Sequence, residues 1–205
     1  MKRGLGFRLV SLLATACCTL ALPVAAQAAA THGSGAHSSV AVRALPPYAA
    51  WISDVTAVTD TAQQYLTTRL PDPSIKAAIV LDIDNTALET TYHPGLTSPA
   101  TAPVLALARQ AQAAGAAVFF VTARPELLEW QTALNLRSAG YPITDIYLRP
   151  TFDFDPDATL KSGARIAIEG RGYRIVANIG NSGSDLQGGH AERTFKLPDY
   201  NGQLP

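Results

Sequence analysis

One apolar segment of the chain ends in two carboxylates that stand one residue apart. Residues 77–86 read Ala-Ala-Ile-Val-Leu-Asp-Ile-Asp-Asn-Thr. A short run of Ile, Val and Leu bounded by polar residues predicts a central strand of a parallel sheet, buried on both faces. In open α/β sheets, ligands bind beyond the carboxyl ends of the strands. Because side chains alternate along a strand, we expect Asp82 and Asp84 on one side, at the place where such a fold carries its site.

A structural interpretation of the same carboxylates also exists. Two aspartates can end a strand in solvent, and Asp84 or Asn85 can act as the N-cap of a following helix. Two like charges this close repel each other unless one is protonated or a cation lies between them. The pair therefore favours a functional site only if further polar residues meet it.

Three later segments supply such residues at the ends of predicted elements. The apolar run 116–121 predicts a second strand and ends in Thr-Ala-Arg-Pro at 122–125. Lys161 opens a predicted helix. The run 174–179 predicts a further strand and ends in Gly-Asn-Ser-Gly-Ser-Asp at 180–185. Carboxyl ends of parallel strands meet at one edge of a sheet, so these groups are expected to lie close together.

This order of motifs resembles the haloacid dehalogenase (HAD) superfamily in its phosphatase branch. Leu-Lys-Ser at 160–162, Gly-Tyr-Arg-Ile at 172–175 and Ser-Asp-Leu at 184–186 are similar to its secreted acid phosphatases, namely the class B and class C enzymes and the plant vegetative storage proteins. The resemblance covers about residues 48–196. It implies a three-layer, Rossmann-like α/β core with a parallel sheet.

The order of predicted elements agrees with that fold. Apolar spacings of three and four predict a long helix from Tyr48 that Pro71 stops. Helices are also predicted over about 103–114 and from Pro125 to Ser138, a short strand over 146–148, and an edge strand over 194–197. Strands that alternate with helices predict a parallel sheet covered on its faces. The loop 89–101 leaves no room for a large cap domain, so we expect an open site.

The first 28 residues are expected to form a secretory signal peptide. Lys2, Arg3 and Arg8 form a basic start, residues 9–25 are apolar, and Ala-Gln-Ala at 26–28 offers a cleavage site. The apolar stretch is too short and weakly flanked for a stable membrane span. A lipoprotein signal is the alternative, but no large aliphatic residue precedes the cysteines in the position that such processing prefers. The protein is therefore expected to be secreted, with no membrane contact after cleavage.

The expected mature chain consists of a flexible linker, 29–47, and a phosphatase-like domain, 48–205. Both cysteines of the sequence leave with the signal, so no disulfide is expected. Three of the 16 basic residues also lie in the signal, so the mature chain has 13 basic and 16 acidic residues. Without a basic surface, binding to nucleic acid through its phosphates is not expected. The oligomeric state and the physiological substrate stay open.

The resemblance also implies chemical roles. Asp82 would attack a phosphate monoester and become an aspartyl-phosphate. Asp84 would protonate the leaving oxygen and then take a proton from the attacking water. Thr122 would hold the phosphoryl oxygens and Lys161 would offset their charge. The structural alternatives are a helix cap for Thr122 and an exposed first-turn residue for Lys161, where a cation is unfavourable. The implied substrate-binding group is Thr122, Ala123, Arg124 and Lys161.

The expected cofactor is Mg²⁺, which prefers oxygen ligands. The implied metal group is Asp82, Asp84, Asn181 and Asp185. Asn181 departs from the family pattern, which has Asp at this position, so a weaker metal site is expected. A catalytically weak or inactive binding or storage protein is therefore the alternative to a secreted acid phosphatase. An acyl or haloacid hydrolase suits Lys161 and Thr122 less well.

Overall fold

The computed structural model describes residues 44–205, and the structural statements below concern that part of the chain. The expected signal peptide and most of the expected linker lie outside the described residues. Within them, no helix is long and apolar enough to cross a membrane. At the start of the described part, Leu45 packs against the core and the carbonyl oxygen of Pro46 accepts a hydrogen bond from the Tyr92 hydroxyl at 2.8 Å.

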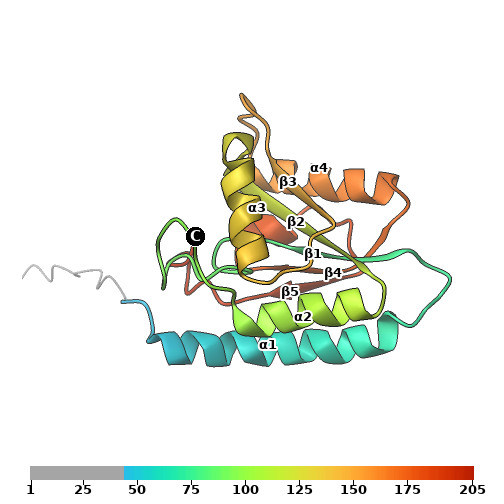
Figure 1. The fold of residues 1–205 in the computed structure, drawn as a ribbon, viewed down its shortest axis with the longest axis horizontal. Coiled ribbons are helices and arrows are strands. Elements are labelled where there is room, and N and C mark those ends of the chain that lie inside the picture. The colour runs from blue at the N-terminus through green and yellow to red at the C-terminus, as the bar shows by residue number, and fades with distance from the viewer. Residues whose placement is uncertain (1–43) are drawn as a thin grey trace, which may run out of the picture. The chain divides into compact units, whose positions relative to one another are not determined.

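A five-stranded sheet forms the centre of the fold (Figure 1). Its order is β3-β2-β1-β4-β5, and all four neighbouring pairs are parallel. The strand with the two aspartates at its end is the middle one, so it has a hydrogen-bonded neighbour on both sides. The strands are β1 (Ala77–Leu81), β2 (Ala117–Pro125), β3 (Asp145–Arg149), β4 (Arg174–Gly180) and β5 (Arg193–Lys196).

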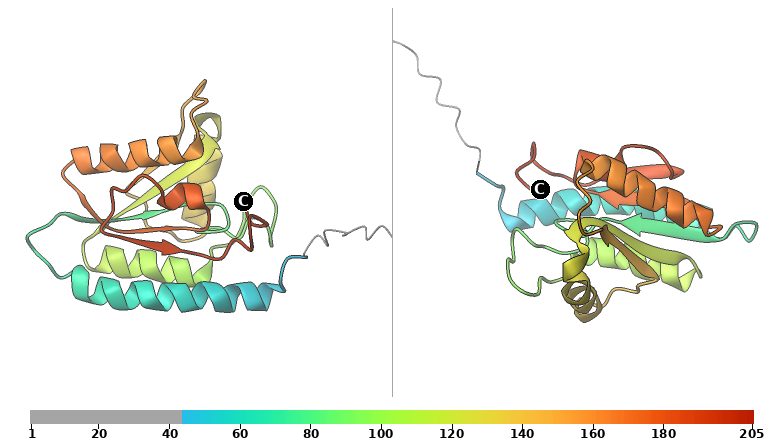
Figure 2. Two further views of the ribbon diagram at one scale, coloured as in Figure 1. Left: turned by 180° about the vertical axis from the view of Figure 1, so that it is seen from behind. Right: turned by 90° about the horizontal axis from the view of Figure 1, so that it is seen from above.

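Helices cover both faces of this sheet (Figure 2). Helices α1 and α2 pack side by side on one face, and α4 lies on the other. A 3₁₀ turn, η1, leads into α3, and a single turn, α5, follows β4. The helices are α1 (Tyr48–Arg69), α2 (Ala102–Ala113), η1 (Glu126–Leu128), α3 (Glu129–Ser138), α4 (Asp157–Gly170) and α5 (Gly183–Leu186).

The alternation of β1 explains why its apolar run is unbroken. Ile79 and Leu81 enter the larger core cluster beneath α1 and α2. Ala78 and Val80 enter a smaller cluster that includes Ile168 of α4. Both faces of the strand are therefore buried, which is the reason such a strand contains no polar residue until its end. The predicted three-layer α/β class without a large cap domain is confirmed.

Two predicted boundaries were wrong. The sequence predicted a helix from Pro125, but β2 continues to that residue, which pairs with Arg149 of β3 after a shift in register. Pro125 has extended backbone angles, so the chain turns through η1 before α3 begins. Lys161 was expected to open its helix, but α4 begins at Asp157, after Pro156 in the cap position. Lys161 thus lies one turn inside the helix. It is not in the first turn, where a cation would be unfavourable.

Candidate active site

The carboxyl ends of β1, β2 and β4 and the first turns of α4 enclose a cavity of about 380 Å³. Every residue that the sequence proposed for the site lines it, and the structure therefore brings the whole predicted set together. The sequence did not predict Asp157, Ser182, Ser184 or Pro205 as part of this set. The lining residues are Asp82, Asp84, Thr122, Ala123, Arg124, Asp157, Lys161, Asn181, Ser182, Ser184, Asp185 and Pro205.

Lys161 lies between two buried carboxylates at the floor of this cavity. Its Nζ is 2.9 Å from Oδ1 of Asp82 and 2.5 Å from Oδ1 of Asp185. All three side chains are almost completely buried. Burial disfavours the charged ammonium, but the two carboxylates outweigh it and raise the pKa of Lys161. The ammonium is therefore a fixed positive charge in the lining of the cavity.

The same burial acts in the opposite sense on Asp82. Loss of water, and then the negative charge of Asp185, raise the pKa of Asp82 to about 7, although Lys161 acts against both. Asp82 Oδ1 accepts the hydrogen bond from Lys161, and among the described residues no donor reaches its Oδ2. One carboxylate oxygen thus has no protein partner and borders the cavity.

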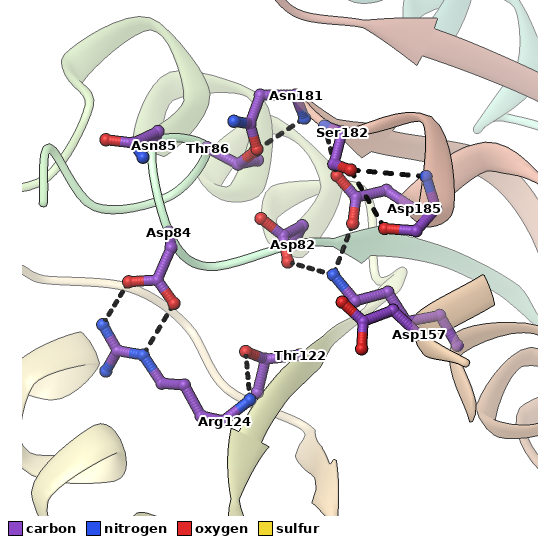
Figure 3. A network of polar contacts seen from close by, with 12 residues as sticks. Asp82, Asp84, Asn85, Thr86, Thr122, Arg124, Asp157, Asn181, Ser182 and Asp185 are labelled. Atoms are coloured by element: carbon purple, nitrogen blue, oxygen red, sulfur yellow. Dashed lines mark hydrogen bonds and ion pairs between the residues drawn. The ribbon is translucent and has the colours of Figure 1, made fainter. Parts of the chain in front are cut away.

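Asp84 has a different environment from Asp82. Its two oxygens accept from Nε and Nη2 of Arg124 at 2.9 and 2.7 Å, in a bidentate pair (Figure 3). The Asp84 side chain is 36% exposed, so it stands at the mouth of the cavity. Each aspartate of the motif therefore lies beside a cation, which offsets part of the repulsion between the two, although the charge of Asp84 still contributes to the raised pKa of Asp82. Arg124 contacts Asp84 directly, a relationship that the sequence did not reveal.

Thr122 is buried at the end of the regular part of β2. Its hydroxyl oxygen accepts the backbone N–H of Arg124 at 3.1 Å, which folds the segment Thr122–Arg124 back on itself. That hydrogen bond leaves the hydroxyl proton available to a ligand in the cavity. The helix-cap interpretation of Thr122 does not hold, because no side-chain cap is present at η1 or α3.

Asn181 is held on both sides of its amide group. Its Oδ1 accepts the hydroxyl of Thr86 at 3.1 Å, and its Nδ2 donates to the carbonyl oxygen of Leu204 at 2.9 Å. Asn85 donates in the same way to the carbonyl oxygen of Pro205, at 2.9 Å. The two asparagines thus fix residues 204–205 along one wall of the cavity. No sequence motif predicted this arrangement.

The loop with Asp185 is fixed from behind by a buried arginine. Arg165, on the same face of α4 as Lys161, donates to the carbonyl oxygens of Asp185, Gln187 and Gly189. Asn178 of β4 also donates to the Asp185 carbonyl, at 2.8 Å. The only sequence signal for Arg165 was its spacing of four from Lys161, which places both on one helix face.

Asp185 itself completes a short helix start. Its Oδ2 accepts the backbone N–H of Ser182 at 2.7 Å, and Ser182 and Asp185 form a capping box around α5. A Cβ at Gly180 would overlap the Asp185 side chain, so glycine is required where β4 ends. Asp185 is thereby held at the distance from Asp82 that one ammonium can bridge.

The donors around the cavity fit Mg²⁺ in kind. They are carboxylate and amide oxygens, and Mg²⁺ usually takes one or two carboxylates together with waters and substrate phosphate. Within residues 44–205 there is no group of three or more His, Cys, Asp or Glu side chains that could hold a metal unaided. The open oxygen of Asp82, the second lone pair of Asn181 Oδ1 and the remaining lone pairs of the Asp84 and Asp185 carboxylates are the donors that remain for an ion.

Comparison with known proteins agrees with this arrangement. The family model for the HAD superfamily, subfamily IIIB (acid phosphatase), matches residues 93–203. Acid phosphatase 1 of Solanum lycopersicum is 38% identical over 106 residues, which cover 50% of this chain and 42% of that protein. A stem 28 kDa glycoprotein of Glycine max is 38% identical over 90 residues, 42% of this chain and 35% of the relative. The chain therefore matches less than half the length of these relatives.

The fold has a similar counterpart among solved structures. The class C acid phosphatase from Bacillus anthracis superposes with a TM-score of 0.62 at 18% identity, covering 75% of this chain and 79% of that one. A structure of that enzyme with tungstate bound gives a TM-score of 0.61. At this identity the likeness concerns the fold alone, whereas the family model and the relatives confirm the resemblance found in the sequence.

Proposed function

Because this chain belongs to subfamily IIIB of the HAD superfamily, the acid phosphatase subfamily, we propose that it hydrolyses phosphate monoesters. The observation that carries the proposal is the position of Lys161 between Asp82 and Asp185. A buried ammonium beside a carboxylate with one open oxygen suits the two needs of phosphoryl transfer, which are a positioned nucleophile and compensation of the phosphate charge.

In the proposed first step, the open oxygen of Asp82 attacks phosphorus and the bond from phosphorus to the ester oxygen breaks. Asp84 gives the leaving oxygen its proton. In the second step, water attacks the aspartyl-phosphate, Asp84 takes a proton from that water, and inorganic phosphate leaves with Asp82 restored. Asp84 is suited to this role because it stands at the cavity mouth, where a leaving group passes. Arg124 must release one of its oxygens for the transfer.

The phosphoryl oxygens are proposed to lie against the Thr122 hydroxyl, the backbone of Ala123 and Arg124, and the ammonium of Lys161. Lys161 keeps its proton throughout, because two carboxylates stabilise the charged form. Thr122 can donate its hydroxyl proton because its oxygen already accepts from the backbone. These contacts become stronger as negative charge gathers on the transferred group.

A divalent cation, proposed to be Mg²⁺, would be held by Asp82, Asp84, Asn181 and Asp185. When bound, it would neutralise charge between the nucleophile and the phosphate. Asn181 supplies a neutral oxygen, so the site would hold its ion more weakly than one with a fourth carboxylate at that position. Secretion through a cleaved signal peptide is part of the same proposal, and it rests on residues 1–28 of the sequence.

A binding or storage protein without strong catalysis is the second candidate. It is favoured by Asn181, whose amide is used on both sides for protein contacts. Relatives named as stem glycoproteins in Glycine max are consistent with this alternative.

An assay of nitrophenyl phosphate with and without EDTA tests the proposal. Turnover that EDTA removes and Mg²⁺ restores, and that Asp82→Asn abolishes, supports the metal-dependent phosphatase. The matched control is Asp60→Asn, which removes a carboxylate from an exposed position on α1. If the protein binds inorganic phosphate but turns over no ester at any Mg²⁺ concentration, the storage alternative is favoured.

A further inference from the structure

Two phenyl rings and a leucine side chain stand in solvent next to the cavity. Phe152 is 85% exposed, Phe154 is 89% exposed, and Leu127 of η1 is 82% exposed. Exposure of single apolar residues is ordinary, but three large ones in two adjoining segments form a patch, and such a patch marks a binding surface. Phe152 even adopts a left-handed backbone, with φ of +67°, which is uncommon for a large side chain.

The patch borders a groove of about 500 Å³ between the β3–α4 loop and η1. Its walls are mostly carbon, with two prolines and three large apolar side chains. The groove is lined by Pro125, Leu127, Arg149, Pro150, Thr151, Phe152, Asp153, Phe154 and Asp155. A volume of this size accepts an aromatic ring system together with its water.

The loop that presents the rings is held in place by charged groups. Arg149 at the end of β3 donates to the carbonyl oxygens of Asp153 and Asp155 at 3.2 and 2.9 Å. It also contacts the carboxylates of Asp153 and Asp157, at 3.3 and 2.5 Å. One arginine thus ties the loop to itself and to the start of α4.

The two walls of the groove are also tied to each other. Glu126 of η1 accepts both the backbone N–H and the hydroxyl of Thr151, at 2.9 and 2.6 Å. Phe152 follows Thr151 directly, and Leu127 follows Glu126. These two hydrogen bonds hold the loop with Phe152 and Phe154 against the turn with Leu127. The exposed side chains therefore line a groove whose two walls are connected.

The groove continues toward the catalytic cavity. Asp157, which Arg149 contacts, also lines that cavity. A third hollow of about 400 Å³ lies between the two, because it shares Thr122 with the catalytic cavity and shares Pro150, Asp153 and Asp155 with the groove. The lining of this third hollow therefore links Thr122 in the catalytic cavity to the residues of the groove.

We propose that this groove binds the leaving group of the substrate and that it selects neutral, aromatic leaving groups. The proposal rests on the proposed phosphatase function. Phe152, Phe154 and Leu127 would supply flat apolar contacts, which favour a ring over a polyol chain. Asp155 on the wall of the groove would disfavour a leaving group with a second negative charge, whereas the charge of Asp153 is offset by Arg149. The three apolar residues are specificity-determining, and they take no part in the bond-breaking step.

The test compares 1-naphthyl phosphate with glycerol phosphate in the full chain. The variant is the double substitution Phe152→Asn with Phe154→Ser, in which Asn suits the left-handed backbone at 152. We expect kcat/KM for naphthyl phosphate to fall about tenfold, through KM, for a loss of about 1.4 kcal/mol of apolar contact. For glycerol phosphate kcat/KM should stay within about twofold, a difference below 0.5 kcal/mol. Ile166→Ser, an exposed apolar residue on α4, is the control and should change neither value.

A second readout does not depend on turnover. Fluorescence titration with 1-naphthol should show weaker binding to the double variant than to the wild type or Ile166→Ser. If both esters lose activity equally, or neither does, the groove proposal is wrong while the phosphatase function stands. If light scattering shows that the double variant dissociates an oligomer and the ester ratio is unchanged, the patch is an interface between copies and the proposal falls. If the wild type hydrolyses neither ester, the phosphatase function itself fails, and the groove proposal with it.

Discussion

The side-chain amide of Asn181 donates to the carbonyl oxygen of Leu204 while its own oxygen accepts from Thr86. An aspartate here could keep the contact with Thr86, but it has no proton for Leu204. The neutral residue that departs from the family pattern therefore has a structural task, which is to hold the wall of the cavity near Pro205. With the metal role proposed for Asn181, metal affinity and the packing of that wall would place opposite demands on this one position.

Asn181→Asp should separate these two demands. The added charge should lower the Mg²⁺ concentration for half-maximal activity several-fold. The attraction to a divalent ion is larger than the cost of removing water from the ion and the carboxylate, but that cost cancels part of it. The lost donor should reduce the free energy of unfolding by about 1–3 kcal/mol in metal-free protein. Magnesium titrations of activity and of Tm, from EDTA-stripped protein, measure both.

Asn201→Asp, which adds the same charge at an exposed position on the C-terminal segment, is the control for Asn181→Asp. Coincident magnesium curves for Asn181→Asp and the wild type would mean that residue 181 does not contact the ion. An unchanged Tm would mean that the Leu204 contact contributes nothing.

Asp82→Asn should change how stability depends on pH in the absence of metal. The pKa of Asp82 in the folded protein is raised to about 7, so its ionisation disfavours the folded state. That contribution to stability is present below about pH 4 and is lost as the pH rises through about 7. The wild type should therefore lose Tm across this window relative to Asp82→Asn, and the variant should be the more stable form above pH 7. Thermal unfolding in EDTA between pH 4 and 8 measures it, and parallel profiles would contradict the cause assigned to the shift.

Asp84→Asn should separate leaving groups by their need for a proton. Hydrolysis of an alkyl phosphate should fall by about 10²–10⁴-fold, the usual contribution of a general acid. Nitrophenyl phosphate should lose less, because nitrophenolate leaves without protonation. Parallel kcat/KM measurements on the two esters decide this, and an equal loss on both would assign Asp84 another role. Asp60→Asn, at an exposed position on α1, is the control.

Arg165→Met should destabilise the protein and loosen the loop behind Asp185. The substitution keeps much of the volume but leaves the carbonyl oxygens of Gln187 and Gly189 without this donor, while that of Asp185 keeps only its hydrogen bond from Asn178. The free energy of unfolding should fall by about 1–3 kcal/mol for each buried carbonyl oxygen left without a donor. Denaturant unfolding measures this value, and hydrogen exchange of residues 185–189 should rise. Arg165→Lys keeps the charge but cannot reach three acceptors, so a loss as large as that of Arg165→Met would show that geometry dominates over charge.

The sequence predicted the strands well because a parallel sheet needs apolar runs, and Asp82, Thr122 and Asn181 follow directly where those runs end. It did not predict the start of α4 correctly. The helix begins after Pro156, at Asp157, whereas the prediction placed its start at Lys161 because of the family motif there. Arg165 could not be assigned, since its burial depends on carbonyl groups that exist only after the loop has formed. The pair of Asp84 and Arg124 and the return of Leu204 to Asn181 are contacts between distant segments, and no local pattern contains them.

The central place of β1 has a consequence for how the protein can be divided. Its neighbours are β2, later in the chain, and β4, later still, and each of the three strands brings a different part of the chemistry to one edge. Asp82, Thr122 and Lys161 lie together only in a fragment that contains all of residues 82–161. Cleavage in the β3–α4 loop would separate Asp82 and Thr122 from Lys161, yet the two pieces share a sheet and can recombine. Turnover recovered from co-expressed halves would then report how much native strand pairing forms between the two polypeptides. This makes the fold a candidate for a split reporter.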